Sequence, residues 1–360
     1  MGIKGFFLEI LPRIFGEEWK DFEISKFSCD CVILDIPGLI NKLAVNEEKQ
    51  PLLTSRELGR RLTLFAKQST AKSLVFISDK SAIPLSLKDA TRTERAVNRP
   101  EPYSVSKFVS DGMICNHEIL PFDPMRVMLN TESRLKLYQY LQEYLQITDL
   151  PVVYLDIDGC EKCTIDKGKM VSCKLFAKDF AEADHAIAYI ISMLMIDKAN
   201  RRFTVRTIDS DVVMILLCRF FSRLRTRAIE IRIDRADSKV GVNLNRMADI
   251  LAERGMHPHA MLGVCMIAGN DFFHKSLYSH GVGIGVIVQS VLKQIDDINT
   301  SSTYKLAQSL LTIIKTCPRS DNVPEKPEQR LVKIKNDMWN VENPFKLFDQ
   351  VFVYFIESSY

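Results

Sequence analysis

Four apolar runs in this sequence each end at an acidic residue, and this pattern restricts the fold more than any other feature. The runs end at Asp35 (CVILD), Asp79 (LVFISD), Asp209 (FTVRTID) and Asp271 (GVCMIAGND). Short apolar runs of this kind are typical of strands buried on both faces, and helix-like segments separate them along the chain. The alternation predicts an α/β domain with a central, mainly parallel sheet and helices on both faces.

Acids at the ends of parallel strands are expected to meet, because the carboxyl ends of such strands share one edge of the sheet. Asp209 and Asp211 form an i, i+2 pair after one run, and Glu182 and Asp184 open a predicted helix just upstream. The sequence therefore predicts one cluster of metal-binding acids, made of Asp35, Asp79, Glu182, Asp184, Asp209, Asp211 and Asp271.

Clustered carboxylates need a cation, because each negative charge raises the pKa of its neighbours. Hard oxygen ligands suit Mg²⁺, with Mn²⁺ as a substitute. Two such ions serve in-line hydrolysis of a phosphodiester, in which they generate hydroxide and stabilise both the attacking and the leaving oxygen. Any single Asp in the set is better interpreted as an ordinary turn or N-cap residue, and only for the pair Asp209 and Asp211 are the two interpretations equally good. The prediction therefore depends on the whole set.

Composition excludes several classes of protein. The chain has 360 residues with a net charge of +3, 46% hydrophobic and 26% charged residues, which excludes a disordered chain and a polycation. A local basic patch for nucleic acid stays open. No apolar run reaches the roughly 18 residues of a membrane span, and no leader is seen, so we expect no membrane partner and an intracellular location, in the nucleus or cytoplasm.

The order and rough spacing of the motifs over residues 1–290 resemble those of the XPG/flap-endonuclease superfamily of 5′ nucleases. One motif departs from the family spelling VFDG, since Ser78 interrupts it and Lys80 replaces the glycine. The segments that carry the resemblance are the MGIKGF start, Cys31–Asp35, Val75–Asp79, Ala181–Asp184, Thr207–Asp211 and Ala268–Phe272.

The resemblance implies a PIN-like 5′-nuclease fold, two Mg²⁺ ions and further functional residues. Lys88 and Arg95 match two basic family residues that contact the scissile phosphate, and their i, i+7 spacing puts both on one helix face. Arg92 lies on an adjacent face and is counted with the nucleic-acid-binding residues. The alternative for this segment is a solvated basic face. Gly2 is expected at the mouth of the active site.

A glycine-rich segment follows Asp271, where the family has a helix–hairpin–helix that grips duplex DNA with a bound K⁺. Gly281, Gly283 and Gly285 permit close approach of the backbone to phosphate; the alternative is a loop that closes the sheet. We therefore expect a nuclease core over residues 1–275 with an insertion at about 97–180, a helix–hairpin–helix-like region over 276–316, and a linker and tail over 317–360.

The expected activity is Mg²⁺-dependent, structure-specific cleavage of DNA with a 5′ flap, a nick or a duplex/single-strand junction, in replication, repair or recombination. Some spellings, such as Asp209–Val212 and Gly269–Phe272, resemble 5′→3′ exoribonucleases, so an RNA nuclease is the alternative. A non-catalytic nucleic-acid binder is the second alternative. Gln350 does not start a sliding-clamp motif, and a monomer is expected.

The cysteines offer one further candidate site. Cys160 and Cys163 have the Cys-x2-Cys spacing of a zinc site, and Cys173 follows in the same insertion. No fourth ligand is evident, so free thiols on a hairpin are predicted in place of structural zinc.

Overall fold

The computed structural model describes ten segments of the chain, which are residues 3, 5–43, 71–80, 131–146, 150–173, 178–180, 182–196, 200–235, 238–268 and 283–292. The chain divides into two compact units. A sheet unit is built from Asp21–Ile208 and Ile229–Val242. A helical unit is built from the described parts of Met1–Lys20, Asp209–Ala228 and the chain from Asn243 onward.

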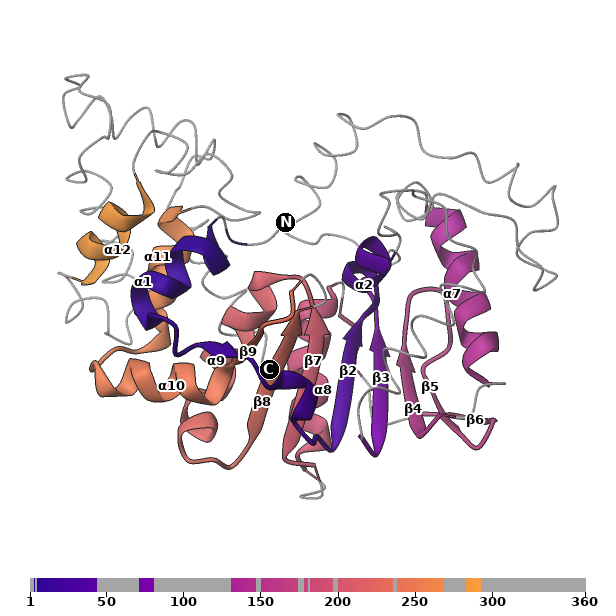
Figure 1. Cartoon of the computed structure of the whole chain (residues 1–360). Coiled ribbons are helices and arrows are strands. Elements are labelled where there is room, and N and C mark those ends of the chain that lie inside the picture. The colour runs from indigo at the N-terminus through magenta and orange to yellow at the C-terminus, as the bar shows by residue number, and fades with distance from the viewer. Residues whose placement is uncertain are drawn as a thin grey trace. The chain divides into compact units, whose positions relative to one another are not determined.

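The described strands form one sheet whose middle is parallel (Figure 1). Its order is β1-β9-β8-β7-β2-β3-β4-β5-β6, in which β2 pairs in parallel with both β3 and β7, β3 pairs with β4, and β7 pairs with β8. The bounds are β1 (Lys20–Asp21), β2 (Cys31–Asp35), β3 (Ser73–Ile77), β4 (Val152–Asp156), β5 (Cys163–Asp166), β6 (Lys169–Ser172), β7 (Arg202–Thr207), β8 (Glu230–Arg235) and β9 (Gly241–Asn243).

The two central strands explain why the apolar runs are continuous. Every residue of β2 and of β3 is buried. A strand covered on both faces has no solvent side, so its sequence is apolar throughout and does not alternate. The predicted α/β fold with a mainly parallel central sheet is confirmed, and three of the four acid-terminated runs, those before Asp35, Asp79 and Asp209, are strands.

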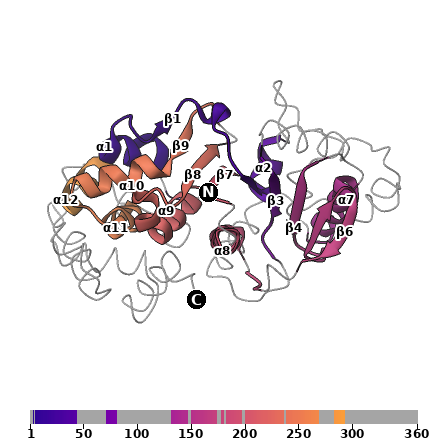
Figure 2. The ribbon, with the colours of Figure 1, turned by 90° about the horizontal axis from the view of Figure 1, so that it is seen from below.

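Helices and a hairpin complete the sheet unit. Helix α2 (Ile36–Leu43) follows β2 directly, α7 (Thr131–Gln146) precedes β4, and α8 (Ala183–Leu194) precedes β7. The predicted hairpin in the insertion is formed by β5 and β6, which pair antiparallel with β4 and with each other. Helix α7 lies beside this hairpin (Figure 2), where the Gln142 amide contacts the sulfur atoms of Cys163 and Met170. A short 3₁₀ turn, η2 (Ile24–Lys26), precedes β2.

In the described part of the helical unit, the N-terminal segment packs against α11 and α12. A π-helical turn, η1 (Phe6–Ile10), runs into α1 (Leu11–Phe15), and both contact α12 (Ile284–Leu292). Helix α9 (Ser210–Arg225) contacts α10 (Leu244–Glu253) and α11 (Pro258–Ala268), and α11 also contacts α12. The Asn245 side-chain amide donates to the Leu224 carbonyl at 2.9 Å, so the polar group buried between α10 and α9 is satisfied.

The fourth acid-terminated run was wrongly expected to be a strand. Leu262–Ile267 lies inside helix α11, which begins at Pro258. A short apolar run fits either structure, and here Pro258 at the first helical position together with Ala260, Met261 and Leu262 favours the helix. Strand β8 was missed, although EIRIDR alternates polar and apolar residues as a strand does.

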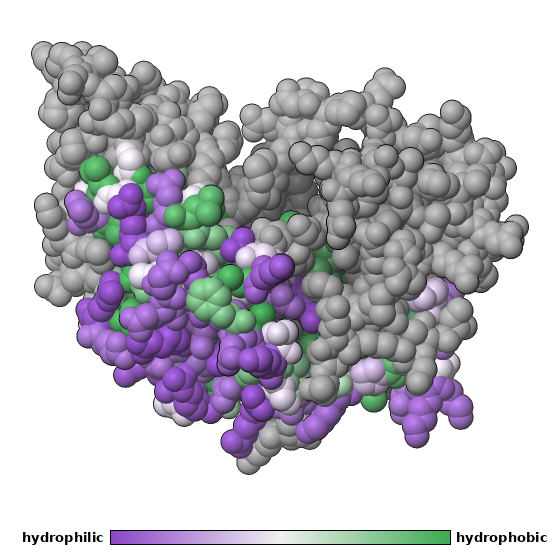
Figure 3. Space-filling model, in the orientation of Figure 1, coloured by the Kyte–Doolittle hydropathy of each residue, from purple (hydrophilic) through white to green (hydrophobic). Residues whose placement is uncertain are grey.

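The surface of the described residues carries only scattered large apolar side chains. The most exposed of these are Leu8, Phe22 and Ile196, and the described surface in Figure 3 is largely hydrophilic. Within the described segments, no helix combines the length and apolar character needed to cross a bilayer. The domain boundaries predicted at residues 275 and 316 stay predictions, because 269–282 and 293–360 lie outside the described residues.

Asp30 ties together the amino ends of three neighbouring strands. Its carboxylate accepts from the backbone amides of Arg201 and Arg202, both at 3.0 Å, and pairs with the Lys72 ammonium at 3.3 Å. Burial alone would raise the pKa of Asp30, but these hydrogen bonds hold the pKa below its usual value. The ionised form is therefore the one that stabilises the fold.

We predict that Asp30→Asn lowers the free energy of unfolding by about 1–2 kcal/mol at pH 7. Because the folded pKa is depressed, this stabilisation is present above the unfolded pKa of about 3.9 and is lost as pH falls through the folded pKa. Thermal melts of both proteins at pH 7 and pH 3 measure the difference in stability between Asp30→Asn and wild type. Asp166→Asn, at the exposed end of β5, is the control. A difference between Asp30→Asn and wild type that is as large at pH 3 as at pH 7 would contradict the account.

Candidate metal centre

Asp35 is the last residue of β2 and faces the end of the neighbouring strand. Its side chain is buried, and its Oδ2 accepts from the Thr207 hydroxyl at 2.7 Å. Thr207 ends β7, two residues before Asp209. A Cβ atom at Gly38 would lie 3.0 Å from the same Oδ2, so the glycine leaves room for the carboxylate at the start of α2.

Asp79 connects the end of β3 to the start of α8. Its Oδ1 accepts from the backbone amide of Ala183 at 2.9 Å. Ala183 is the first residue of α8, Glu182 is the extended N-cap residue, and Asp184 lies in the first turn. The hydrogen bond satisfies one of the amides that a helix start leaves without a partner, and it fixes the start of α8 beside the exit of β3.

Tyr138 shows that Asp35 and Asp79 lie in one neighbourhood. Burial raises the pKa of the Tyr138 hydroxyl above its usual range, and the charges of Asp79 and Asp35 raise this pKa further. The sheet unit therefore gathers the two acids from adjacent strand ends around one buried phenol, as the shared edge of parallel strands predicts.

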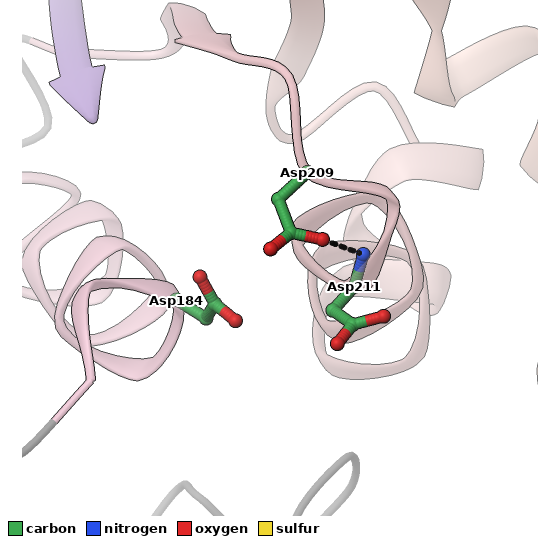
Figure 4. Close-up of side chains that lie close together, drawn as sticks. All are labelled: Asp184, Asp209 and Asp211. Carbon is green, nitrogen blue, oxygen red and sulfur yellow. Dashed lines mark hydrogen bonds between the residues drawn. The ribbon is translucent and has the colours of Figure 1, made fainter. Parts of the chain in front are cut away.

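Asp184, Asp209 and Asp211 form the tightest group of acids (Figure 4). Each offers one carboxylate oxygen, and these oxygens all lie within 4.8 Å of one another. Asp209 follows β7 and is the N-cap of α9, where its Oδ1 accepts from the Asp211 amide at 3.0 Å. Among the residues that the structure describes, this is the only group of three or more His, Cys, Asp or Glu side chains so arranged.

The donor set fits a hard divalent cation. All three ligands are carboxylates, and Asp184 and Asp211 are 5% and 0% exposed. Water does little to screen repulsion between such buried charges, so a bound cation lowers their free energy. The field of Asp211 extends to α11, where burial and then this carboxylate raise the pKa of the Cys265 thiol. Oxygen ligands at this spacing suit Mg²⁺ or Mn²⁺.

Several predicted site residues lie outside the described residues. Glycines 283 and 285 are described: Gly283 precedes α12, and a Cβ atom there would meet no atom within 4 Å of the described structure. At Gly285 such an atom would lie 2.8 Å from Arg13 Nη1, so the guanidinium packs against the first turn of α12. The residues outside are Gly2, Lys88, Arg92, Arg95, Asp271 and Gly281, and their roles stay predictions.

Sequence reasoning missed two buried acids at the same edge of the sheet. Asp156 ends β4 and Asp158 follows it, and they are 2% and 3% exposed. The signal was present, because VVYLD is an apolar run that ends in an acid, as CVILD is. The candidate zinc cysteines Cys160, Cys163 and Cys173 are free thiols that do not form a metal-binding group in the described part of the chain.

Comparison with known proteins gives matches among solved structures. No protein-family model and no curated protein matches the sequence. The matches include structures described as a flap endonuclease and a 5′-exonuclease of bacteriophage T5. The D15 protein of bacteriophage T5, crystallised with metal ions, is 14% identical with a TM-score of 0.45, over 92% of this chain and 90% of that chain.

Two of the other matches are structures with DNA. Human GEN1 in complex with Holliday junction DNA is 13% identical with a TM-score of 0.47, over 99% of this chain and 66% of that chain. The catalytic core of Rad2 in complex with a DNA substrate is 12% identical with a TM-score of 0.40, over 99% and 100% of the two chains.

We predict that Asp211→Asn raises the Tm of the metal-free protein by about 2–4 °C, the shift that about 1 kcal/mol produces in a domain of this size. The substitution removes one of three mutually repelling charges. Mg²⁺ should raise the Tm of the wild type by binding the folded state and should have little effect on the variant. Melts with 10 mM Mg²⁺ and with EDTA test this, and an identical response of the two proteins to Mg²⁺ would exclude Asp211 as a ligand.

Proposed function

We propose that the protein is a divalent-metal-dependent 5′ nuclease of the XPG/flap-endonuclease type, which hydrolyses phosphodiesters in branched or nicked DNA. One observation carries the proposal. Three acids of the sequence motifs, Asp184, Asp209 and Asp211, each place a carboxylate oxygen within 4.8 Å of the other two. The hydrogen bonds from Thr207 to Asp35 and from Ala183 to Asp79 orient two more acids of the set.

The roles proposed for the residues rest on this arrangement and, for those outside the described residues, on the resemblance of the sequence motifs. Asp184, Asp209 and Asp211 would hold the metal, with Asp35, Asp79, Glu182 and Asp271 completing a two-ion site. When bound, Mg²⁺ lowers the pKa of a water molecule and stabilises charge on the phosphate and on the leaving oxygen. Lys88 and Arg95 would neutralise the scissile phosphate as its charge develops, and Arg92 and Gly2 would contact the nucleic acid. Gly281, Gly283 and Gly285 would approach the duplex backbone, in a segment that would also hold K⁺.

An RNA 5′→3′ nuclease is the second candidate, because the spelling Asp209-Ser210-Asp211-Val212 resembles that of exoribonucleases. A non-catalytic nucleic-acid binder is disfavoured on physical grounds. Its affinity would come from neutralising phosphates with cations, and a buried cluster of acids facing a polyanion lowers that affinity unless it holds metal.

The test is cleavage of labelled 5′-flap DNA, nicked duplex, linear duplex and single-stranded RNA, with Mg²⁺ or with EDTA. We predict Mg²⁺-dependent cleavage of the flap and nicked substrates. Preferred cleavage of RNA would establish the second candidate in its place. Absence of cleavage on all four substrates, by a protein that binds them, would establish the non-catalytic alternative.

Substituting Asp209→Asn together with Asp211→Asn should lower the cleavage rate by more than about 100-fold. Loss of a residue that only supports a metal ligand typically costs roughly 10–100-fold in activity, and these two residues are proposed as ligands themselves. DNA affinity should persist or increase, because two charges that repel phosphate are removed. The matched control is Glu161→Gln with Asp166→Asn, which removes two exposed acids of the hairpin region. Retained wild-type turnover in the Asp209/Asp211 variant would reject the metal assignment.

The glycine segment has a separate test in Gly283→Val. The added side chain meets no described atom within 4 Å of its Cβ, so the Tm should stay near that of the wild type. If the backbone there approaches duplex phosphates, affinity for substrates with a duplex arm should fall and should depend less on salt, whereas single-strand binding should not change. A folded variant with wild-type duplex affinity would remove this contact from the proposal.

A further inference from the structure

The exits of β3 and β4 are joined by a buried set of hydrogen bonds. Ile77 and Asp156 are register partners at the ends of these parallel strands. Just beyond them, the Ser78 amide donates to the Asp156 carbonyl at 3.2 Å, and the Asp158 amide donates to the Ser78 hydroxyl at 2.8 Å. The same hydroxyl donates to the Asp79 carbonyl at 3.1 Å, and Ser78 is 1% exposed.

On the C-terminal side of Asp79, Lys80 forms a largely buried ion pair with Asp156. Lys80 Nζ lies 2.7 Å from Asp156 Oδ1, and the two side chains are 12% and 3% exposed. Removing one partner of such a pair leaves an uncompensated buried charge, which is strongly destabilising. Lys80 therefore points inward to β4 and is not displayed to a ligand in solvent.

Cations of the protein lie beside both acids at the exit of β4. Asp156 has Lys162 Nζ at 3.9 Å in addition to Lys80, and Asp158 has Arg134 Nη2 at 3.8 Å. Their charges are compensated by the protein itself, so Asp156 and Asp158 do not need a metal ion. Their position at the shared edge of the sheet requires another explanation.

Asp79 lies between the two attachments. Ser78 on one side and Lys80 on the other tie its backbone to β4, and its own Oδ1 accepts from Ala183, the residue between Glu182 and Asp184. The exit of β4 thus holds residue 79, and residue 79 holds the first turn of the helix that presents Asp184.

We propose that Lys80 and Asp156, with Ser78 and Asp158, form a positioning cluster that fixes Asp79 and the start of α8 for metal binding. Ser78 and Lys80 are the two residues at which this chain departs from the VFDG spelling, and both make their contacts with the unpredicted acids of β4. The inference rests on the proposed function, because it assigns these residues to the same metal centre.

Replacing the Lys80–Asp156 ion pair by apolar residues distinguishes an effect on metal binding from an effect on the stability of the fold. A buried pair exchanged for well-packed hydrophobic residues is often neutral in stability, so Lys80→Met with Asp156→Leu should keep the Tm close to that of the wild type. Loss of outer-shell support typically costs about 10–100-fold in metal affinity. We therefore expect the Mn²⁺ Kd of this double variant to rise about 10-fold or more.

Mn²⁺ binding to the DNA-free protein is measured by the electron paramagnetic resonance signal of the free ion. In the same double variant, kcat at saturating Mn²⁺ should change less than the Mn²⁺ Kd. The control is Lys72→Met. Lys72 lies just before β3, at the end opposite to Lys80, where its side chain pairs with Asp30 and is 77% exposed. This control should bind Mn²⁺ as the wild type does.

Wild-type Mn²⁺ affinity in a folded double variant would overturn the proposal. If the double variant does not fold, Ser78→Ala, which removes only the shared hydroxyl, decides in its place by the same Mn²⁺ titration. A salt-dependent loss of DNA affinity in Lys80→Met, with unchanged Mn²⁺ affinity, would make Lys80 a phosphate contact and would also overturn it. The Mn²⁺ titration needs neither DNA nor cleavage. If the wild-type protein binds Mn²⁺ but cleaves no substrate, the proposed nuclease function is rejected and the positioning cluster can still be tested.

Discussion

Parallel pairing of β7, β2, β3 and β4 places the carboxyl ends of four strands at one edge of the sheet, and acidic residues occupy each of these ends. Like charges so close to one another oppose folding unless each is compensated. Two arrangements of these acids are seen in the described residues. At the end of β4 it supplies its own cations, Lys80 and Arg134. At Asp184, Asp209 and Asp211 the oxygens converge as ligands of a divalent ion would.

The hydrogen bonds around the remaining acids show how the fold keeps them in place. Asp35 is oriented by Thr207 on the neighbouring strand, and Asp79 is oriented by the first amide of α8. Each bond links an acid at the end of one element to the element that carries the next acid in the group. These hydrogen bonds therefore hold Asp35 and Asp79 in fixed positions relative to β7 and α8.

Much of this could be predicted from sequence because the apolar runs and the acids are local signals. CVILD, SLVFI and FTVRT lie in strands and are buried throughout, as a continuous apolar run in a central parallel sheet predicts. The prediction of a strand at Leu262–Ile267 was wrong because the length of this run fits a helix and a strand equally. The deciding residue, Pro258, lies outside the run. Asp156 was overlooked although VVYLD carries the same signal. Its partner Lys80 lies far away in sequence, and such pairings are settled by tertiary packing alone.

The central claim is that Asp184, Asp209 and Asp211 share a divalent cation. Anomalous diffraction from crystals soaked in Mn²⁺ tests it most directly, because the metal is located independently of any activity. The account predicts an anomalous peak within about 2.5 Å of oxygens from these three carboxylates. A fully occupied Mn²⁺ elsewhere in the protein, with no peak among the three, would contradict it.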